Sequence, residues 1–294
     1  MNLTSPSQVK AWCIENDFHP NRTLGQNFLV DKNVLESIVD AGLEGVAQGE
    51  AVLEIGPGLG VMTEELLARG HRVVAIEKDA VLASRLAGSL AGAGAPLEVI
   101  AGDALDERLM SEALAKVGSP DPNGPALISN LPYQAGTRII LELAQARAVR
   151  QMTVLLQTEV AERLAAAPGG RARSLAGVWA QLDYNVASIR MVSASCFWPR
   201  PDVGSAVVRL SRHDRNTSLT QVERDLFHRV TKMAFAHRRK MLSTIFKSVD
   251  TKLLALSQEP SAVRILPEFA SLRPEALSVA DWITLTKGLI NDDA

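Results

Sequence analysis

The chain has 294 residues, of which 47% are hydrophobic and 22% charged, and its formal net charge is −2. This length allows one large α/β domain and a smaller companion, and the composition is that of an ordinary globular protein. No stretch approaches the roughly 20 apolar residues of a membrane span, and residues 1–18 do not resemble a secretory signal. Cys13 and Cys196 suggest neither a disulfide framework nor a metal site. We therefore expect a cytoplasmic protein without metal.

Positive charge is concentrated in residues 171–250. This segment holds 14 Lys and Arg against 6 Asp and Glu, a net charge of +8, so the remainder of the chain carries −10. A basic segment on an acidic chain is typical of a protein that presents one face to nucleic-acid phosphates. A chance cluster of charges on solvated helices is the alternative, and the charge pattern alone leaves it open.

Strand and helix patterns alternate over the first half of the chain. Apolar runs typical of buried strands occupy residues 51–55, 71–77, 96–101, 125–129 and 151–157, and amphipathic helical stretches occupy residues 61–69, 78–90 and 137–148. This alternation predicts an α/β fold with a mostly parallel, doubly wound sheet. Ligands of such sheets bind at the carboxyl ends of the strands.

The pattern changes in the second half of the chain. Two β-rich runs, residues 182–192 and 205–210, precede a polar stretch at residues 211–220 that resembles a linker. Beyond it the pattern is helical throughout. We therefore predict a domain of residues 1–212 that contains the sheet and a small all-helical domain of residues 213–294.

A glycine-rich segment, Gly56-Pro57-Gly58-Leu59-Gly60, follows the first of these strands. Glycine allows backbone to approach a ligand closely, although a tight turn without a ligand explains the loop equally simply. Glu77 ends the next strand, where a carboxylate can accept hydrogen bonds from ribose hydroxyls, and Asp103 ends the third, where an acid can accept from an adenine amine. The glycine spacing and the second acid favour S-adenosylmethionine over NAD. Glu54, separated from the loop by one residue, is either a further acid near a cationic ligand or an ordinary strand-end carboxylate.

The segment Asn130-Leu131-Pro132-Tyr133 follows the fourth strand. The exocyclic amine of adenine is a poor nucleophile because its lone pair is delocalised into the ring. The side-chain oxygen of Asn130 and a backbone carbonyl oriented by Pro132 can accept the two N–H hydrogens and favour a tetrahedral, nucleophilic nitrogen. Tyr133 offers a face on which an extruded base can stack, worth roughly 1–3 kcal/mol. The alternative is a turn with a capping asparagine, and these four residues alone do not exclude it.

Motifs along nearly the whole chain resemble those of the small-subunit rRNA adenine dimethyltransferase family (KsgA/RsmA). The segments that carry the resemblance are residues 24–29 (LGQNFL), 53–58 (LEIGPG), 76–79 (IEKD), 102–104 (GDA), 130–133 (NLPY), 157–160 (QTEV), 197–203 (FWPRPDV), 205–210 (SAVVRL) and 234–240 (AFAHRRK). Their order and spacing together are highly specific.

The resemblance implies a Rossmann-like class I methyltransferase sheet and a set of site residues. Asn27 and Leu29 belong to an N-terminal segment that folds over the cofactor, S-adenosylmethionine. The remaining cofactor residues implied by the family are Gly56, Gly58, Glu77, Asp103 and Asn130. Phe197 resembles the aromatic residue that faces Tyr133 across a flipped adenine, and its alternative is a core phenylalanine.

The resemblance also implies a substrate. Family members dimethylate N6 of two adjacent adenosines near the 3′ end of 16S rRNA, within the immature 30S subunit. Arg238, Arg239 and Lys240 resemble a basic helix of the C-terminal domain that meets this rRNA. A monomer is expected. Two alternatives are the related 23S rRNA adenine methyltransferases of macrolide resistance and a non-catalytic RNA-binding assembly or transcription factor.

Three positions depart from the usual family pattern. Gln134-Ala135-Gly136 replaces Asn-Ile-Ser after Tyr133, Gly204 stands where an aspartate usually precedes Ser205, and residues 172–177 lack the usual Tyr-Gly-x-Leu-Ser. These loops adjoin the expected base pocket. They bear on substrate handling more than on cofactor binding.

Overall fold

The computed structural model describes residues 2–21, 24–89, 96–216, 218–247 and 265–291. The chain divides into two compact units, one of residues 1–161 with 184–212 and the other of residues 162–183 with 213–294. No helix among the described residues is both long enough and apolar enough to span a membrane.

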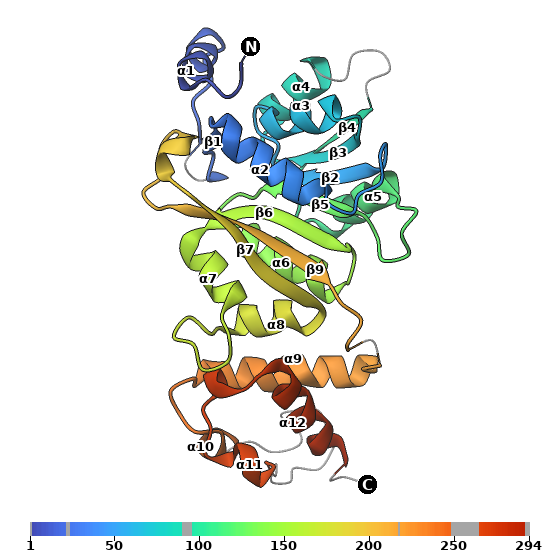
Figure 1. Cartoon of the computed structure of the whole chain (residues 1–294), viewed down its shortest axis with the longest axis vertical. Coiled ribbons are helices and arrows are strands. Elements are labelled where there is room, and N and C mark those ends of the chain that lie inside the picture. Colours follow the sequence, from blue (N-terminus) through green and yellow to red (C-terminus); the bar gives the residue numbers. More distant parts are fainter. Residues whose placement is uncertain (1, 22–23, 90–95, 217, 248–264, 292–294) are drawn as a thin grey trace. The chain divides into compact units, whose positions relative to one another are not determined.

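The first unit is built on a seven-stranded sheet in the order β4-β3-β2-β5-β6-β9-β7 (Figure 1). The first five strands in this order are parallel to one another. The strand β9 is antiparallel to β6, and β7 is antiparallel to β9. The strands are β2 (Ala51–Ile55), β3 (Arg72–Glu77), β4 (Leu97–Ala101), β5 (Ala126–Asn130), β6 (Gln151–Gln157), β7 (Tyr184–Val192) and β9 (Ser205–Arg212). The predicted mostly parallel, doubly wound sheet is confirmed.

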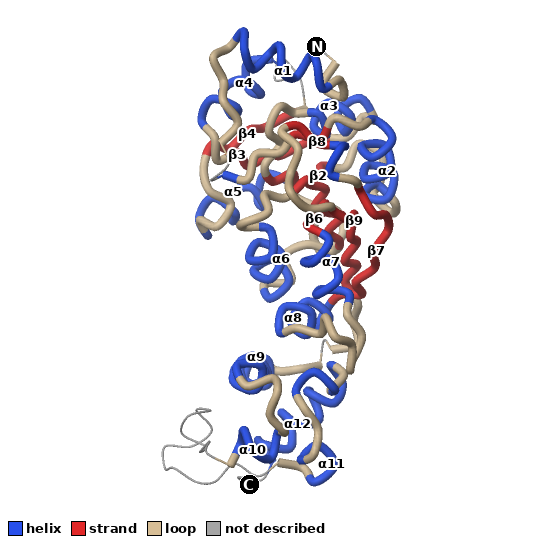
Figure 2. The backbone as a smooth tube through the Cα atoms, turned by 90° about the vertical axis from the view of Figure 1, so that its left-hand side faces the viewer, coloured by secondary structure: helices blue, strands red, loops and turns tan. Residues whose placement is uncertain are grey.

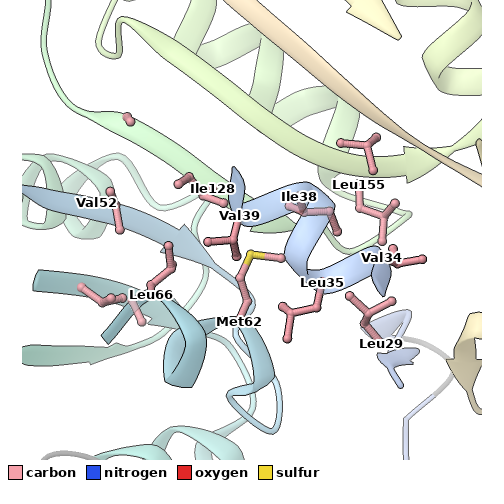
Figure 3. Packing of buried hydrophobic residues seen from close by; sticks show 14 of the residues in the cluster. Leu29, Val34, Leu35, Ile38, Val39, Val52, Met62, Leu66, Ile128 and Leu155 are labelled. Carbon is pink, nitrogen blue, oxygen red and sulfur yellow. The ribbon is translucent and has the colours of Figure 1, made fainter. Parts of the chain in front are cut away.

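Helices cover both sides of this sheet. The helices α2 and α3 lie on one side of the strands, and α5 and α6 lie on the other (Figure 2). The helices of this part of the chain are α1 (Pro6–Glu15), α2 (Lys32–Leu43), α3 (Val61–Ala68), α4 (Ala80–Ser89), α5 (Glu107–Val117), α6 (Gly136–Gln145) and α7 (Thr158–Ala165). Between α2, α3 and the strands, Ile38, Met62 and Ile128 pack in one hydrophobic cluster (Figure 3). This core fixes the strand ends from which the loops of the site project.

A second, two-stranded sheet ties the N-terminal segment to a distant loop. In it, β1 (Phe28–Leu29) runs antiparallel to β8 (Phe197–Trp198), which follows a 3-10 turn at Ala194–Cys196. The N–H of Val30 also donates to the carbonyl of Cys196 at 2.8 Å. Residues 24–30 are therefore held in place by the segment that contains Phe197.

The second unit is helical and has its own core. Its elements are α8 (Leu175–Asp183), α9 (Gln221–Ala236), α10 (Leu242–Phe246), α11 (Pro267–Ala270), a 3-10 turn (Pro274–Ala276) and α12 (Val279–Asn291). Phe227, Phe246 and Trp282 are nearly or fully buried in one cluster. A capping box of Thr220 and Glu223 begins α9 and satisfies free N–H groups at its first turn.

The structure differs from the sequence prediction at one place in this region. The run predicted as β-rich from residue 182 begins as a strand only at Tyr184, because Leu182 packs in the helical core and Asp183 forms a buried ion pair with Arg224. Residues 162–183 form one compact unit with the C-terminal helices. The division into domains 1–212 and 213–294 stays a prediction.

Candidate active site

A pocket of the first unit gathers the loops that follow β2, β3, β4 and β5, together with the N-terminal segment. Its lining includes nearly all of the predicted cofactor and catalytic residues: Asn27, Leu29, Gly56, Gly58, Glu77, Asp103, Asn130, Pro132 and Tyr133. Parallel strands end at one edge of the sheet, so residues far apart in sequence meet there.

Glu77 connects the glycine loop to the end of β3. Its Oε2 accepts the Gly58 N–H at 2.9 Å, and its Oε1 accepts the Asp79 N–H at 2.8 Å. Burial raises the pKa of Glu77, and these two N–H donors oppose that shift. Each carboxylate oxygen keeps a further lone pair that can accept a hydrogen bond from a ligand hydroxyl.

Both conformation and space favour glycine at position 58. Gly58 has φ +60°, in the left-handed region, and a Cβ there would lie 3.1 Å from Cε1 of Phe28. Gly56 also has a left-handed φ, of +68°, and its Cβ would lie 3.5 Å from Cδ of Pro132. The loop can therefore run close to both the N-terminal segment and the turn after β5.

Asp103 is held in its ionised form by a neighbouring lysine. Its Oδ2 accepts a hydrogen bond from Nζ of Lys78 at 2.8 Å, and its Oδ1 accepts one from the Leu105 N–H at 3.0 Å. The Lys78 hydrogen bond lowers the pKa of Asp103. Lys78, which directly follows Glu77, also lines the pocket, and no sequence pattern predicted a role for it.

The turn after β5 presents the Asn130 side chain. The Pro132 carbonyl accepts the N–H groups of Ala135 and Gly136 at 3.1 and 2.8 Å, which closes the turn that begins α6. Nδ2 of Asn130 donates to the Asn27 carbonyl at 3.2 Å. This bond gives the amide one orientation and leaves its Oδ1 as a hydrogen-bond acceptor.

Tyr133 is anchored by a residue that the sequence analysis did not single out. Its hydroxyl lies 2.7 Å from Oγ of Ser205, which is fully buried at the start of β9. Burial raises the pKa of Tyr133, so its hydroxyl is neutral. Ser205 was visible in the sequence only as part of a family motif.

Phe197 is placed differently from the other predicted residues. It is 3% exposed, packs in the same hydrophobic cluster as Leu29 and Val192, and does not line the pocket. The structure therefore shows the core position that the sequence analysis weighed as the alternative. Stacking of Phe197 on a base stays a prediction that requires its side chain to become accessible.

The predicted RNA-binding residues lie on a turn rather than on a helix. The helix α9 ends at Ala236, and Arg238, Arg239 and Lys240 follow it. Arg238 donates to Oε2 of Glu275 at 2.9 Å, whereas Arg239 and Lys240 are exposed and form no ion pair with another described residue. The last two are therefore the cations of this group that are available to phosphates.

Part of the positive charge of residues 171–250 is engaged by other groups of the protein. Arg224 forms two hydrogen bonds with Asp183, at 2.6 and 3.0 Å, and both side chains are buried. Arg209 pairs with Glu44, and Arg173 is wholly buried. The net charge of the segment thus overstates the charge that can face RNA. Over the described residues, no group of three or more His, Cys, Asp or Glu side chains is arranged to hold a metal ion.

The site and the fold agree with the similarity of this chain to known proteins. The family model for ribosomal RNA adenine dimethylase matches residues 17–276. Proteins named ribosomal RNA small subunit methyltransferase A are similar to this chain. The one from Deinococcus radiodurans is 45% identical over 71% of this chain and 67% of its own length. The one from Cutibacterium acnes is 35% identical over 98% of this chain and 94% of its own length.

Two solved structures share the fold. A dimethyladenosine transferase from Plasmodium falciparum has a TM-score of 0.69 and 24% identity, with 87% of this chain and 94% of that one covered. The 23S rRNA methyltransferase ErmE has a TM-score of 0.58 and 23% identity, with 90% of this chain and 99% of that one covered. The expected class I methyltransferase fold with C-terminal helices is thereby confirmed. The chain belongs to the ribosomal RNA adenine dimethylase family.

Proposed function

We propose that this protein transfers methyl groups from S-adenosylmethionine to N6 of two adjacent adenosines near the 3′ end of 16S rRNA, within the immature 30S subunit. The observation that carries the proposal is the pocket in which Glu77, Asp103 and the turn from Asn130 to Tyr133 meet. Membership of the dimethylase family and the small-subunit names of the relatives support rRNA as the substrate.

The residues of the pocket fit S-adenosylmethionine. Gly56 and Gly58 line the pocket and carry no side chain, so the backbone of this loop faces the cavity. Glu77 offers acceptor positions for the ribose hydroxyls, and the ionised Asp103 offers one for the adenine amine. Asn27 and Leu29 close the site from the N-terminal side. The cofactor supplies an electrophilic methyl group on a sulfonium, so the protein needs no strong general base.

The protein's part in the reaction is to position the amine. Oδ1 of Asn130 and the carbonyl that precedes Pro132 accept the two N–H hydrogens of the target adenine, which directs its nitrogen lone pair toward the methyl group. The ring of Tyr133 stacks on the flipped base, while Ser205 holds its hydroxyl at 2.7 Å. Positioning and electrostatics provide the rate enhancement.

The C-terminal helical unit contributes to RNA binding. Arg239 and Lys240 contact phosphates. Arg238, on the same turn, supports these two residues through its ion pair with Glu275. We further propose that the protein works as a monomer in the cytoplasm.

Methyl transfer from labelled cofactor to immature 30S particles that lack these methylations tests the proposal. N6,N6-dimethyladenosine should form in the 16S rRNA of these particles and not in 23S rRNA offered in a parallel reaction, and Asn130→Ala should abolish it. Asn33→Ala, which alters an exposed asparagine away from the pocket lining, should leave transfer unchanged. The proposal fails if adenosine gains no label or if the Asn130 variant is fully active, and label in 23S rRNA would favour the macrolide-resistance activity.

A further inference from the structure

Glu54 is a buried acid in the wall of the pocket. It lies on β2, two residues before Gly56, is 1% exposed, and lines the same cavity as Glu77 and Asn130. Its Oε2 accepts a hydrogen bond from Oγ1 of Thr63 at 2.7 Å. Thr63 is itself fully buried on α3, so this contact is shielded from solvent.

No cation of the described residues neutralises this carboxyl. The charged group from β3 that acts on it is Glu77, which is a second acid. On α3, Glu65 is bonded to Arg69 and Glu64 interacts with Arg85.

The other strand and helix packed against β2 supply no counter-ion either. The strand β5 has no titratable side chain. On α5, Lys116 is paired with Glu98 and Glu112, and Arg108 is exposed, whereas Glu54 is buried. Burial, and then the repulsion from Glu77, raise the pKa of Glu54 to about 8. Glu54 is therefore neutral at pH 7 in the free protein.

We propose that Glu54 is the counter-ion of the cationic cofactor and that it releases its proton to solvent when the cofactor binds. This inference rests on the proposed cofactor, S-adenosylmethionine, which carries a sulfonium and an α-ammonium. Either cation, entering a buried site beside a neutral carboxyl, favours the carboxylate form. The O–H bond of the carboxyl breaks, its electron pair stays on Glu54, and the buffer takes the proton.

A pH dependence of binding follows from this coupling. Below pH 8 the free protein must lose a proton before the ion pair can form, so cofactor affinity should increase with pH by up to about tenfold per unit. Above pH 8 Glu54 is ionised in both states, so its own contribution to the pH dependence of affinity should level off. The product, S-adenosylhomocysteine, keeps the ammonium and lacks the sulfonium, which separates the two cations.

Calorimetric titration of the full-length protein measures this proton directly. S-adenosylmethionine is titrated at pH 7 in phosphate and in Tris, whose ionisation enthalpies differ, and the difference in heat gives the protons released. We expect roughly one proton per cofactor bound. Glu54→Gln should release none and should bind about tenfold more weakly at pH 8. Glu65→Gln, on α3 and bonded to Arg69, should behave as the unaltered protein.

The outcomes separate the inference from the proposed function. Release with both S-adenosylmethionine and S-adenosylhomocysteine supports the inference and identifies the ammonium as the partner, and release with the first alone identifies the sulfonium. Tight binding without proton release, or release that persists in Glu54→Gln, overturns it. Absence of any binding by the unaltered protein would instead contradict the proposed cofactor.

A second variant covers the case in which Glu54→Gln does not fold. Thr63→Val removes the hydroxyl that stabilises the Glu54 carboxylate at nearly constant volume. The pH at which affinity levels off should then rise above that of the unaltered protein, because the pKa of Glu54 increases further. An unshifted pH profile would overturn the proposal.

Discussion

Three acids of one pocket differ in pKa because their surroundings differ. Lys78 lowers the pKa of Asp103 and keeps it ionised. Glu77 is buried but accepts two N–H hydrogen bonds, and Glu54 is buried with one hydroxyl donor and a pKa of about 8. Burial penalises the charged form, and donors or cations restore it. At the residue scale, Asp103 is thus suited to accept a hydrogen bond from a neutral amine, and Glu54 is suited to pair with a cation.

The backbone of the glycine loop gives a prediction at this scale. Gly58→Ala should lower cofactor affinity and reduce the free energy of unfolding by about 1–2 kcal/mol, because a left-handed φ is strained for alanine and the new Cβ crowds Phe28. Gly45→Ala is the matched control, with φ +79° and no neighbour within 4 Å of its Cβ. The control should lose stability and keep cofactor affinity, as measured by urea unfolding and calorimetry. Equal affinities of both variants would contradict the role of the crowded loop.

The contact between Tyr133 and Ser205 gives a second residue-scale prediction. Ser205→Ala leaves a part-buried tyrosine hydroxyl without its partner, which should cost about 1–3 kcal/mol of stability and lower kcat without changing cofactor affinity. Tyr133→Phe removes the hydroxyl and keeps the ring. The double variant should lose less than the sum of the two single losses, because both remove one contact. Additive losses would show that Ser205 does not act through Tyr133.

At the scale of elements, the site depends on strand ends that the sequence made visible. The apolar run at residues 51–55 ends before the glycine loop, and the runs before Glu77, Asp103 and Asn130 end beside polar residues. Periodicity and these terminal residues sufficed to place the strands, because parallel strands share one ligand-binding edge. The sequence alone therefore indicates that loops carried by such strands belong to one site.

Other features of the elements depend on tertiary packing that no local pattern reports. The assignment of α8 to the helical unit follows from the burial of Leu182 and the Asp183–Arg224 pair. Likewise, the continuous helical pattern beyond residue 220 did not reveal that α9 stops at Ala236. The core position of Phe197 reflects its pairing with the N-terminal segment, and Lys78 gains its role only when β3 and β4 lie side by side.

The turn after α9 gives a prediction at the element scale. Charge reversal in Arg239→Glu with Lys240→Glu should weaken rRNA binding and reduce its salt dependence, since each phosphate contact releases counterions. Arg72→Glu with Arg108→Glu changes the net charge equally at exposed positions outside the pocket and should have little effect. Cofactor affinity should stay constant in both variants. Unchanged rRNA affinity over a series of salt concentrations would remove this turn from the RNA interface.

At the scale of the whole molecule, Glu54 couples stability to pH. Its pKa in the folded protein, about 8, lies above the ordinary value near 4.5, so the folded state holds a proton that the unfolded state has lost between these pH values. The contribution of Glu54 is therefore fully present below about pH 4.5 and is lost as the pH rises toward 8, by up to about 1.4 kcal/mol per unit. The free protein carries this cost at the pocket until a cation arrives.

This coupling predicts a difference between two proteins over one pH range. Between pH 6 and 8 the free energy of unfolding of Glu54→Gln should fall less steeply than that of the unaltered protein, in urea titrations without cofactor. Glu65→Gln serves again as the control. Parallel slopes for all three proteins would indicate that Glu54 is ionised in the free protein.

The central claim concerns the nucleotide that the protein modifies, and mass spectrometry of 16S rRNA tests it most directly. rRNA is compared from cells with the protein, from cells without it, and from cells that carry the Asn130→Ala variant. We predict N6,N6-dimethyladenosine at two adjacent positions near the 3′ end in the first and unmodified adenosines there in the other two. Dimethylation that persists in cells without the protein would contradict the account.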